Sequence, residues 1–84
     1  MKKTRVGKIT HYYDKAGVAV LELSAALKEG DEIRIEKGEE GFEQTISSMQ
    51  IEHEKIKTAK KGQAIGLKVK QPVKENSEVF KLSA

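Results

Sequence analysis

The two histidines are the residues of this chain best suited to metal binding or to acid–base chemistry. His11 lies three residues before Asp14, and His53 lies between two glutamates. A metal site needs three or four ligands that converge on one point. The segment after His53 lacks the helical His-Glu-x-x-His spacing that would supply two of them. We therefore predict no metal site and no cofactor, and we interpret both histidines as polar residues on strand surfaces.

A serine nucleophile is the second possibility, because a histidine beside a serine hydroxyl could form a hydrolytic triad. In the α/β-hydrolase pattern such a serine lies on a sharp turn between a strand and a helix. No such sequence surrounds Ser24, Ser47 or Ser48. The chain also contains no cysteine, which excludes thiolate chemistry and is compatible with a reducing compartment. We therefore predict that the chain is not an enzyme and contains no catalytic residue.

Lysine is concentrated in one part of the sequence, which is the best candidate for a binding surface. Residues 55–74 contain seven basic side chains and no acidic one, whereas residues 22–54 contain ten acidic and three basic side chains. Lysine ammonium groups bind phosphates as point charges and do not distinguish bases. One of the two adjacent tyrosines must point outward, where its ring would stack on a base. The predicted RNA-binding residues are Lys55, Lys57, Lys60, Lys61, Lys68, Lys70, Lys74, Arg5 and Tyr12.

The opposite charges of residues 22–54 and 55–74 also allow a simpler interpretation. The two segments could lie side by side in the fold and neutralise each other, because runs of charge are often only solvated faces. The sequence leaves these two possibilities open.

Alternating apolar and polar residues, separated by turns rich in glycine, indicate short β-strands along the whole chain. The expected strands cover residues 5–13, 18–23, 32–36, 42–52, 65–70 and 78–82. The alternation directs Ile33, Ile35, Ile65, Leu67 and Val69 toward the core. A change in the phase of the apolar residues predicts a bulge at Gly7–Lys8, and a second break is expected near Ser47–Ser48.

Three positions in these strands carry more specific expectations. Residues 18–23 are almost entirely apolar, so we expect both faces of this strand to be covered. Phe80 and Leu82 are predicted to point toward the core. Gly66 lies inside a strand, which indicates either crowding by a neighbouring side chain or the close approach of a partner backbone.

The length of 84 residues fits one domain, residues 1–84, without a linker or an internal repeat. The longest apolar run, residues 18–21, is far too short to span a bilayer. The basic start is not followed by the apolar stretch of a signal peptide. We therefore expect a soluble, cytoplasmic protein that does not contact a membrane.

The order of three segments resembles domain two of the translational GTPases, the β-barrel that follows the nucleotide-binding domain in elongation factors. These segments are residues 17–23, 27–33 and 59–67. A longer resemblance, over nearly the whole chain, is to the C-terminal barrel of collagenase-like peptidases, through residues 6–12, 48–53 and 65–69. Together these resemblances imply an all-β fold, a small closed barrel of six to seven strands.

The resemblance to elongation factors implies a stand-alone, non-catalytic binding module. Such barrels contact tRNA and ribosomal RNA, so the expected partner is structured RNA or the ribosome, bound through the lysines of residues 55–74. The chain has no Gly-rich phosphate loop ending in Gly-Lys-Ser or Gly-Lys-Thr, so we expect it to bind no nucleotide by itself.

The resemblance to the peptidases implies an alternative function. The catalytic part of that family lies in a domain that does not match this chain. The chain would then be a protein–protein adaptor that completes a separately encoded peptidase-like or RNA-modifying enzyme. Its acidic stretch, residues 29–43, or an open sheet edge would contact the protein partner.

Overall fold

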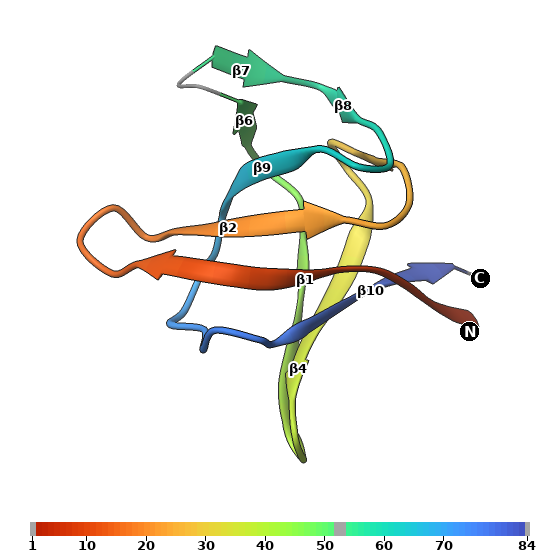
Figure 1. Ribbon diagram of the computed structural model, residues 1–84. Helices are drawn as coiled ribbons and strands as arrows, with labels where there is room; N and C mark the ends of the chain where they lie inside the picture. Colours follow the sequence, from red (N-terminus) through yellow and green to blue (C-terminus); the bar gives the residue numbers. More distant parts are fainter. Residues whose placement is uncertain (1, 52–53, 84) are drawn as a thin grey trace.

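The computed structural model describes residues 2–51 and 54–83, and within these residues the chain is all-β, without a helix (Figure 1). The prediction of an all-β fold is therefore confirmed. The strands are β1 (Lys2–Tyr13), β2 (Val18–Leu23), β3 (Leu27–Lys28), β4 (Glu32–Lys37), β5 (Glu40–Thr45), β6 (Met49–Ile51), β7 (Glu54–Ile56), β8 (Thr58–Ala59), β9 (Ala64–Lys68) and β10 (Glu78–Ser83). The described part of the chain contains no helix that could cross a membrane.

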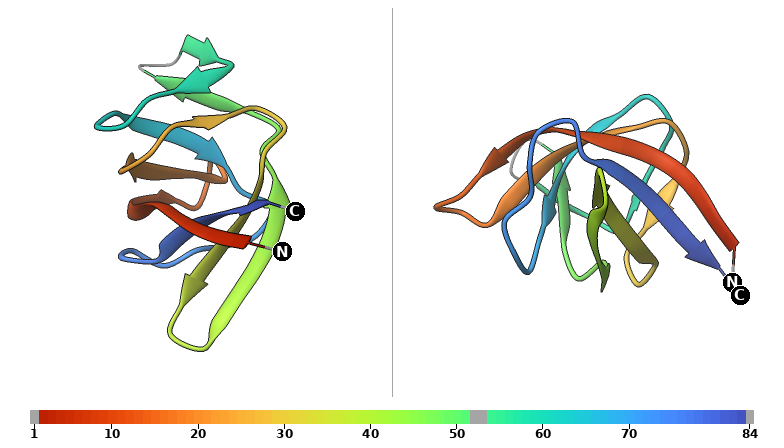
Figure 2. Two further views of the ribbon diagram at one scale, coloured as in Figure 1. Left: turned by 90° about the vertical axis from the view of Figure 1, so that its right-hand side faces the viewer. Right: turned by 90° about the horizontal axis from the view of Figure 1, so that it is seen from below.

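Eight of the strands form one antiparallel sheet in the order β5-β4-β10-β1-β2-β9-β6-β7. The long strand β1 lies near its centre, since its first part pairs with β10 and its second part pairs with β2. Figure 2 shows that the sheet curls strongly and that the two ends of the chain lie side by side, in agreement with the pairing of Lys2 with Ser83. Strands β3 and β8 form a separate two-stranded ladder.

The predicted closed barrel is not confirmed, because no ladder joins the two ends of the sheet within the described residues. The chain leaves the strand conformation at residues 46–48, which confirms the break predicted near Ser47–Ser48. This break lets β5 pair with β4 while β6 pairs with β9. The side-chain amide of Gln44 spans the gap: its Nε2 donates to the backbone oxygen of Lys68 at 2.9 Å, and its Oε1 accepts from the N–H of Lys70 at 3.0 Å.

The inner face of the curled sheet carries the hydrophobic core, and the inward alternation predicted for the strands at 32–36 and 65–70 is confirmed. Leu67 is fully buried and lies opposite Ala19 of β2 and Met49 of β6. The other buried apolar residues are Val6, Ile9, Leu21, Leu23, Leu27, Ile33, Ile35, Ile46, Ala59, Ile65, Val69, Val73 and Val79.

The inward positions predicted for Phe80 and Leu82 are wrong. Val79 is the fully buried residue of β10, and both Phe80 and Leu82 are only half-buried. Phe80 lies opposite Arg34 of β4, and the Lys3 ammonium is 4.4 Å from the centroid of its ring. A shift of one residue exchanges the two faces of a strand, and in this segment apolar residues occupy both sets of positions.

Strand β1 contains two bulges, one on each side of the bulge predicted at Gly7–Lys8. Its pairing with β10 skips Val6, and its pairing with β2 skips Thr10. The first bulge lets Val6 and Gly7 both be buried although they are adjacent. Gly7 is required because a Cβ at this position would collide with the backbone oxygen of Glu22.

Candidate functional site

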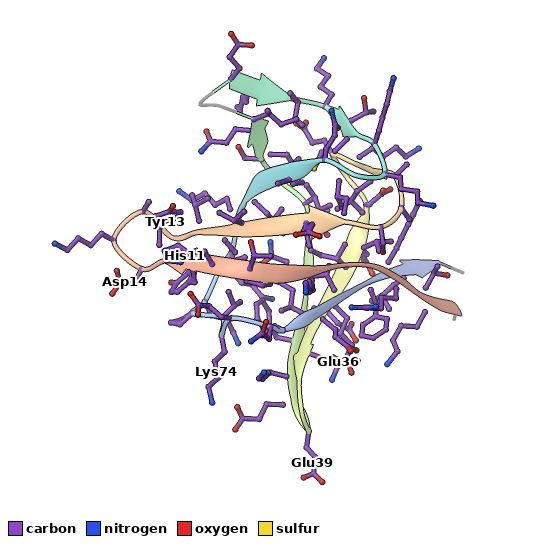
Figure 3. The ribbon with its side chains drawn as sticks, in the orientation of Figure 1. His11, Tyr13, Asp14, Glu36, Glu39 and Lys74 are labelled. Carbon is purple, nitrogen blue, oxygen red and sulfur yellow. The ribbon has the colours of Figure 1, made fainter. Side chains whose placement is uncertain are left out.

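The lysines predicted to bind RNA are all exposed, but the fold does not bring them together. Lys60 and Lys61 precede β9, whereas Lys70 and Lys74 follow it, and Lys68 is its last residue. Strand β9 has five residues, so it separates the two groups by about 17 Å. Figure 3 shows Lys74 on the side of the β1–β2 turn. The lysines of residues 55–74 therefore lie toward both ends of β9.

The other basic residues of the prediction are distributed as well. Lys55 is exposed on the edge strand β7, and Lys57 is exposed between β7 and β8. Arg5 is exposed on the first part of β1, opposite Phe80. The role of these residues in binding stays a prediction.

The two tyrosines before the β1–β2 turn face opposite sides of the sheet. Tyr12 packs against the hydrophobic core, whereas 53% of Tyr13 is exposed. The choice of Tyr12 as the outward ring is therefore corrected to Tyr13. The bulge at Thr10 explains this difference, because one additional residue shifts the alternation that would otherwise direct Tyr13 inward with Ile9.

The acidic stretch at residues 29–43 is paired with bases from outside residues 55–74. Glu36 accepts hydrogen bonds from Lys3 Nζ and Arg34 Nε, both at 2.8 Å. The hydrogen bond from Lys3, together with that from Arg34, holds the pKa of the Glu36 carboxyl below its ordinary value.

Asp31 also pairs with a basic residue outside residues 55–74, since its Oδ2 lies 3.5 Å from Lys81 Nζ. Among the ion pairs of the described residues, none includes a lysine of residues 55–74. Among the residues that the structure describes, the acidic and basic segments of the sequence therefore form no direct ion pair with each other.

His11 is exposed on β1 and lies between two side chains of the same surface. Its Nδ1 is 3.1 Å from Glu75 Oε2, and its ring meets the Tyr13 ring edge-on, with the ring centroids 4.3 Å apart (Figure 3). The exposed tyrosine ring thus packs edge-on against His11. His53, the second histidine of the sequence, lies outside the described residues.

A groove of about 740 Å³ lies beside Tyr13, on the outer face of β2, β9 and β6. Apolar and small side chains make up most of its surface. Its lining residues include Tyr13, Val18, Val20, Gln50, Ala64 and Gly66. The expectation that both faces of residues 18–23 are covered is therefore wrong for the described chain. Val18 and Val20 point outward and are only half-buried.

The strand register places Gly66 in the lining of the groove. Across the sheet, Val20 of β2 lies opposite Gly66 of β9, and Gly66 lies opposite Gln50 of β6. A Cβ on Gly66 would lie 3.1 Å from Gln50 Cγ and 3.3 Å from Val18 Cγ1. The prediction that a neighbouring side chain crowds Gly66 is thus confirmed, because Gln50 and Val18 occupy the space that a Cβ would enter.

The groove was not predicted from the sequence, although the alternation in β2 indicates an apolar patch. Val18 and Val20 share their alternation with Glu22, a charged residue that is exposed at the end of the same strand. Two valines on the face of a glutamate indicate an apolar patch on an outer surface. The sequence does not show that Gly66 lies beside these valines, because their proximity depends on the pairing of β2 with β9.

Comparison with known proteins identifies relatives for nearly the whole chain. No family model matches it. The chain is 38% identical over 82 residues to an uncharacterised protease of Methanocaldococcus jannaschii, a match that covers 96% of this chain and 20% of the relative. It is 34% identical over 82 residues to a collagenase of Porphyromonas gingivalis, covering 95% of this chain and 23% of the relative. The chain thus spans about a fifth of the length of the curated relatives it matches.

A solved structure has the same fold. The crystal structure of the C-terminal domain of a Geobacillus thermoleovorans protein, described as a U32 peptidase, superposes with a TM-score of 0.86 at 25% sequence identity. The match covers 93% of this chain and 91% of that domain. The resemblance to the C-terminal barrel of collagenase-like peptidases is therefore confirmed: the chain is similar to the C-terminal domain of a U32 peptidase.

The same comparisons overturn the main functional expectation. The relatives are a protease, a collagenase and a peptidase domain, and the identification as a stand-alone elongation-factor barrel is not supported. The prediction of a translation-type module that binds RNA is therefore wrong. The findings favour the alternative, a domain associated with a peptidase.

Proposed function

We propose that this chain is a non-catalytic accessory domain that binds a peptidase-like catalytic protein. The observation that carries the proposal is the extent of the matches. They include 95% and 96% of this chain but only 23% and 20% of the two relatives, which leaves most of each relative outside the shared fold. A catalytic function of such proteins then resides in the larger remainder, and the shared fold accompanies it.

The structure of the Geobacillus domain supports the proposal, because a fold of this kind was crystallised there as a C-terminal domain by itself. An accessory domain that folds independently can act through its surface and needs no catalytic group of its own.

The surroundings of His11 also favour a non-catalytic function. Its ring contacts the Glu75 carboxylate and the Tyr13 ring. A histidine that acts as a general base needs a nucleophile or substrate proton within hydrogen-bond distance. Here the neighbouring groups are instead a carboxylate and an aromatic ring.

The test uses the Methanocaldococcus jannaschii relative with its 82 matched residues deleted, produced as a separate protein. We expect this truncated relative to form a stoichiometric complex with the present chain, detected by size-exclusion chromatography with light scattering. The complex should withstand nuclease treatment, because the proposed contact is between proteins.

The matched control is the full-length relative, whose own copy of the fold should occupy the binding site and prevent the complex. The proposal is contradicted by the absence of a complex when both partners are present at about 100 µM, a concentration that reveals even weak interfaces.

A further inference from the structure

We infer that this domain binds the catalytic protein through the outer side of β10 and of the neighbouring parts of β1 and β4. This surface, called the Phe80 face below, consists of Lys3, Arg5, Glu32, Arg34, Phe80 and Leu82. The inference rests on the proposed function and adds the location of the contact and the chemistry of the partner surface, which offers apolar side chains and a carboxylate.

Two apolar side chains of β10 lie outside the hydrophobic core. Val79 is fully buried, and neighbouring residues of a strand point to opposite faces, so Phe80 and Leu82 share the outer face. Both are only half-buried. The half-buried apolar residues that pack against the core include Tyr12 and Phe42 but neither of these two. The solvated face of an antiparallel sheet carries polar residues, so two neighbouring apolar positions here fit a face that a partner covers.

Basic side chains surround Phe80, and one of them is available to a partner. Phe80 lies opposite Arg34 on one side and opposite Arg5 on the other. Arg34 and Lys3 both donate to Glu36 at 2.8 Å. Arg5 is exposed and belongs to none of the ion pairs of residues 2–51 and 54–83. Its guanidinium can therefore bind a carboxylate of the partner beside the aromatic ring.

Net charge does not select the partner of this face. Acidic and basic side chains are equal in number along the outer positions of the paired strands β5, β4, β10 and β1: Glu32, Glu36, Glu43 and Glu78 against Lys3, Arg5, Lys8 and Arg34. Apolar residues surrounded by mixed charges are typical of contacts between the domains of one protein. Aromatic residues and arginine are also the residues most enriched in interfaces.

The place of attachment in a relative identifies the occupant. The Geobacillus fold is a C-terminal domain, so the rest of that protein precedes it and is attached ahead of the first strand. In the present fold β1 begins at Lys2, which pairs with Ser83, and the β1–β2 turn lies at the other end of the strand (Figure 1). Arg5 is three residues from Lys2, about 10 Å along the strand. A short attachment there holds the Phe80 face beside the catalytic part at a high effective concentration.

The first experiment measures binding of the same truncated relative to a variant that lacks the aromatic ring. Phe80→Ala should weaken binding at least about tenfold, as expected for an aromatic side chain at the centre of an interface. Tyr13→Ala is the matched control, because it removes an exposed ring beside the β1–β2 turn. Its affinity should stay within about twofold of that of the parent.

A charge reversal tests the same face without removing apolar surface. Arg5→Glu should weaken binding about fivefold or more, with the largest effect at low salt. Lys74→Glu, on the side of the β1–β2 turn (Figure 3), is the matched control and should leave the affinity within about twofold. Thermal unfolding establishes that each variant is folded. If Phe80→Ala does not fold, Arg5→Glu decides the question, because Arg5 is exposed.

A further experiment locates the contact by cross-linking. Because the chain has no cysteine, a single cysteine carrying a photoreactive benzophenone reports on one position. Glu32→Cys, at an exposed residue opposite Leu82, should cross-link to the truncated relative. Asp14→Cys, at the β1–β2 turn (Figure 3), should not.

The outcomes separate the two proposals. If the parent chain binds, but Phe80→Ala and Arg5→Glu bind equally well, the Phe80 face is not the contact and the proposed function stands. Cross-linking from Asp14→Cys but not from Glu32→Cys has the same meaning. If the parent chain does not bind at all, the proposed function fails and the inference fails with it. Binding that disappears after nuclease treatment would make nucleic acid the occupant and would also overturn the inference.

Discussion

Val20 lies directly opposite Gly66 across the β2–β9 ladder, and the two residues define an opening in the outer face of the sheet. Gly66 is needed at this place because the side chains of Gln50 and Val18 already fill the space that a Cβ would enter. Gly7 occupies a comparable place in β1 but faces inward, against the backbone of β2. Glycine thus avoids a clash with backbone at Gly7 and with outward side chains at Gly66. Substitution of each by alanine distinguishes the two cases.

Gly7→Ala should be strongly destabilising. The added Cβ would collide with the backbone oxygen of Glu22 and lie 2.9 Å from Leu21 Cδ1. Neither the backbone nor the packed core can move easily, so we expect the free energy of unfolding to fall by more than about 2 kcal/mol. Urea unfolding at neutral pH measures this value.

Gly66→Ala is the matched control on the other face. Its Cβ meets the outward side chains of Gln50 and Val18 at 3.1 and 3.3 Å. Gln50 can rotate away, and alanine reduces the entropy of the unfolded chain, so the expected change in the free energy of unfolding is within about 1 kcal/mol. Equal losses for the two variants would contradict the assignment of inner and outer faces.

Gln44→Ala should loosen the connection between β5 and the end of β9. It removes the hydrogen bonds to the Lys68 carbonyl and the Lys70 N–H. We expect a loss of about 1–3 kcal/mol in the free energy of unfolding, because two backbone groups lose their partner. Hydrogen exchange at the Lys70 amide should accelerate. An unchanged exchange rate would show that another group satisfies this amide, and Gln71→Ala, at an exposed neighbour, serves as the control.

Leu67→Asp should abolish folding. Leu67 is fully buried between Ala19 and Met49. An unpaired carboxylate at this position costs several kcal/mol in a domain whose total stability is about 5–15 kcal/mol. Circular dichroism and thermal unfolding test this expectation. Lys68→Asp, one residue further along and exposed, should retain a cooperative transition. A cooperative transition in Leu67→Asp near that of the parent would mean that the faces of β9 are reversed.

The ion pairs of Glu36 make a defined contribution to the dependence of stability on pH. The pKa of Glu36 is lower in the folded chain than its ordinary value, chiefly through the hydrogen bond from Lys3. Such a carboxylate stabilises the fold at neutral pH, above its unfolded pKa, and this stabilisation is lost as the pH falls through the folded pKa.

Glu36→Gln removes this contribution. We expect the variant to be less stable than the parent at neutral pH, and the difference in the free energy of unfolding to shrink toward zero on acidification. Urea unfolding at a series of pH values measures it. Glu39→Gln, on the exposed β4–β5 turn, is the control. A difference that is constant with pH would contradict the role of the charge.

The inward positions of two strands were predictable from sequence because they follow from local alternation. Ile33 and Ile35, and likewise Ile65 and Leu67, are separated by polar or small residues, and all four are buried. The same rule failed for Phe80, because both faces of β10 carry apolar residues. Alternation alone could not identify Tyr13 as the exposed tyrosine, because a bulge at Thr10 shifts the phase of β1 by one residue.

The sequence by itself determined most of the longer strands, the inward residues of the strands at 32–36 and 65–70, and that the chain carries separate acidic and basic segments. These properties depend on neighbouring residues in the chain. The short strands β3, β7 and β8 were not among the expected ones. The tertiary structure alone decided that β9 separates the lysines, that Glu36 pairs with Lys3, and that Val20 faces Gly66. Positions across a sheet depend on which distant strands pair and in which register. No local pattern specifies that pairing, so the groove became visible only in the folded chain.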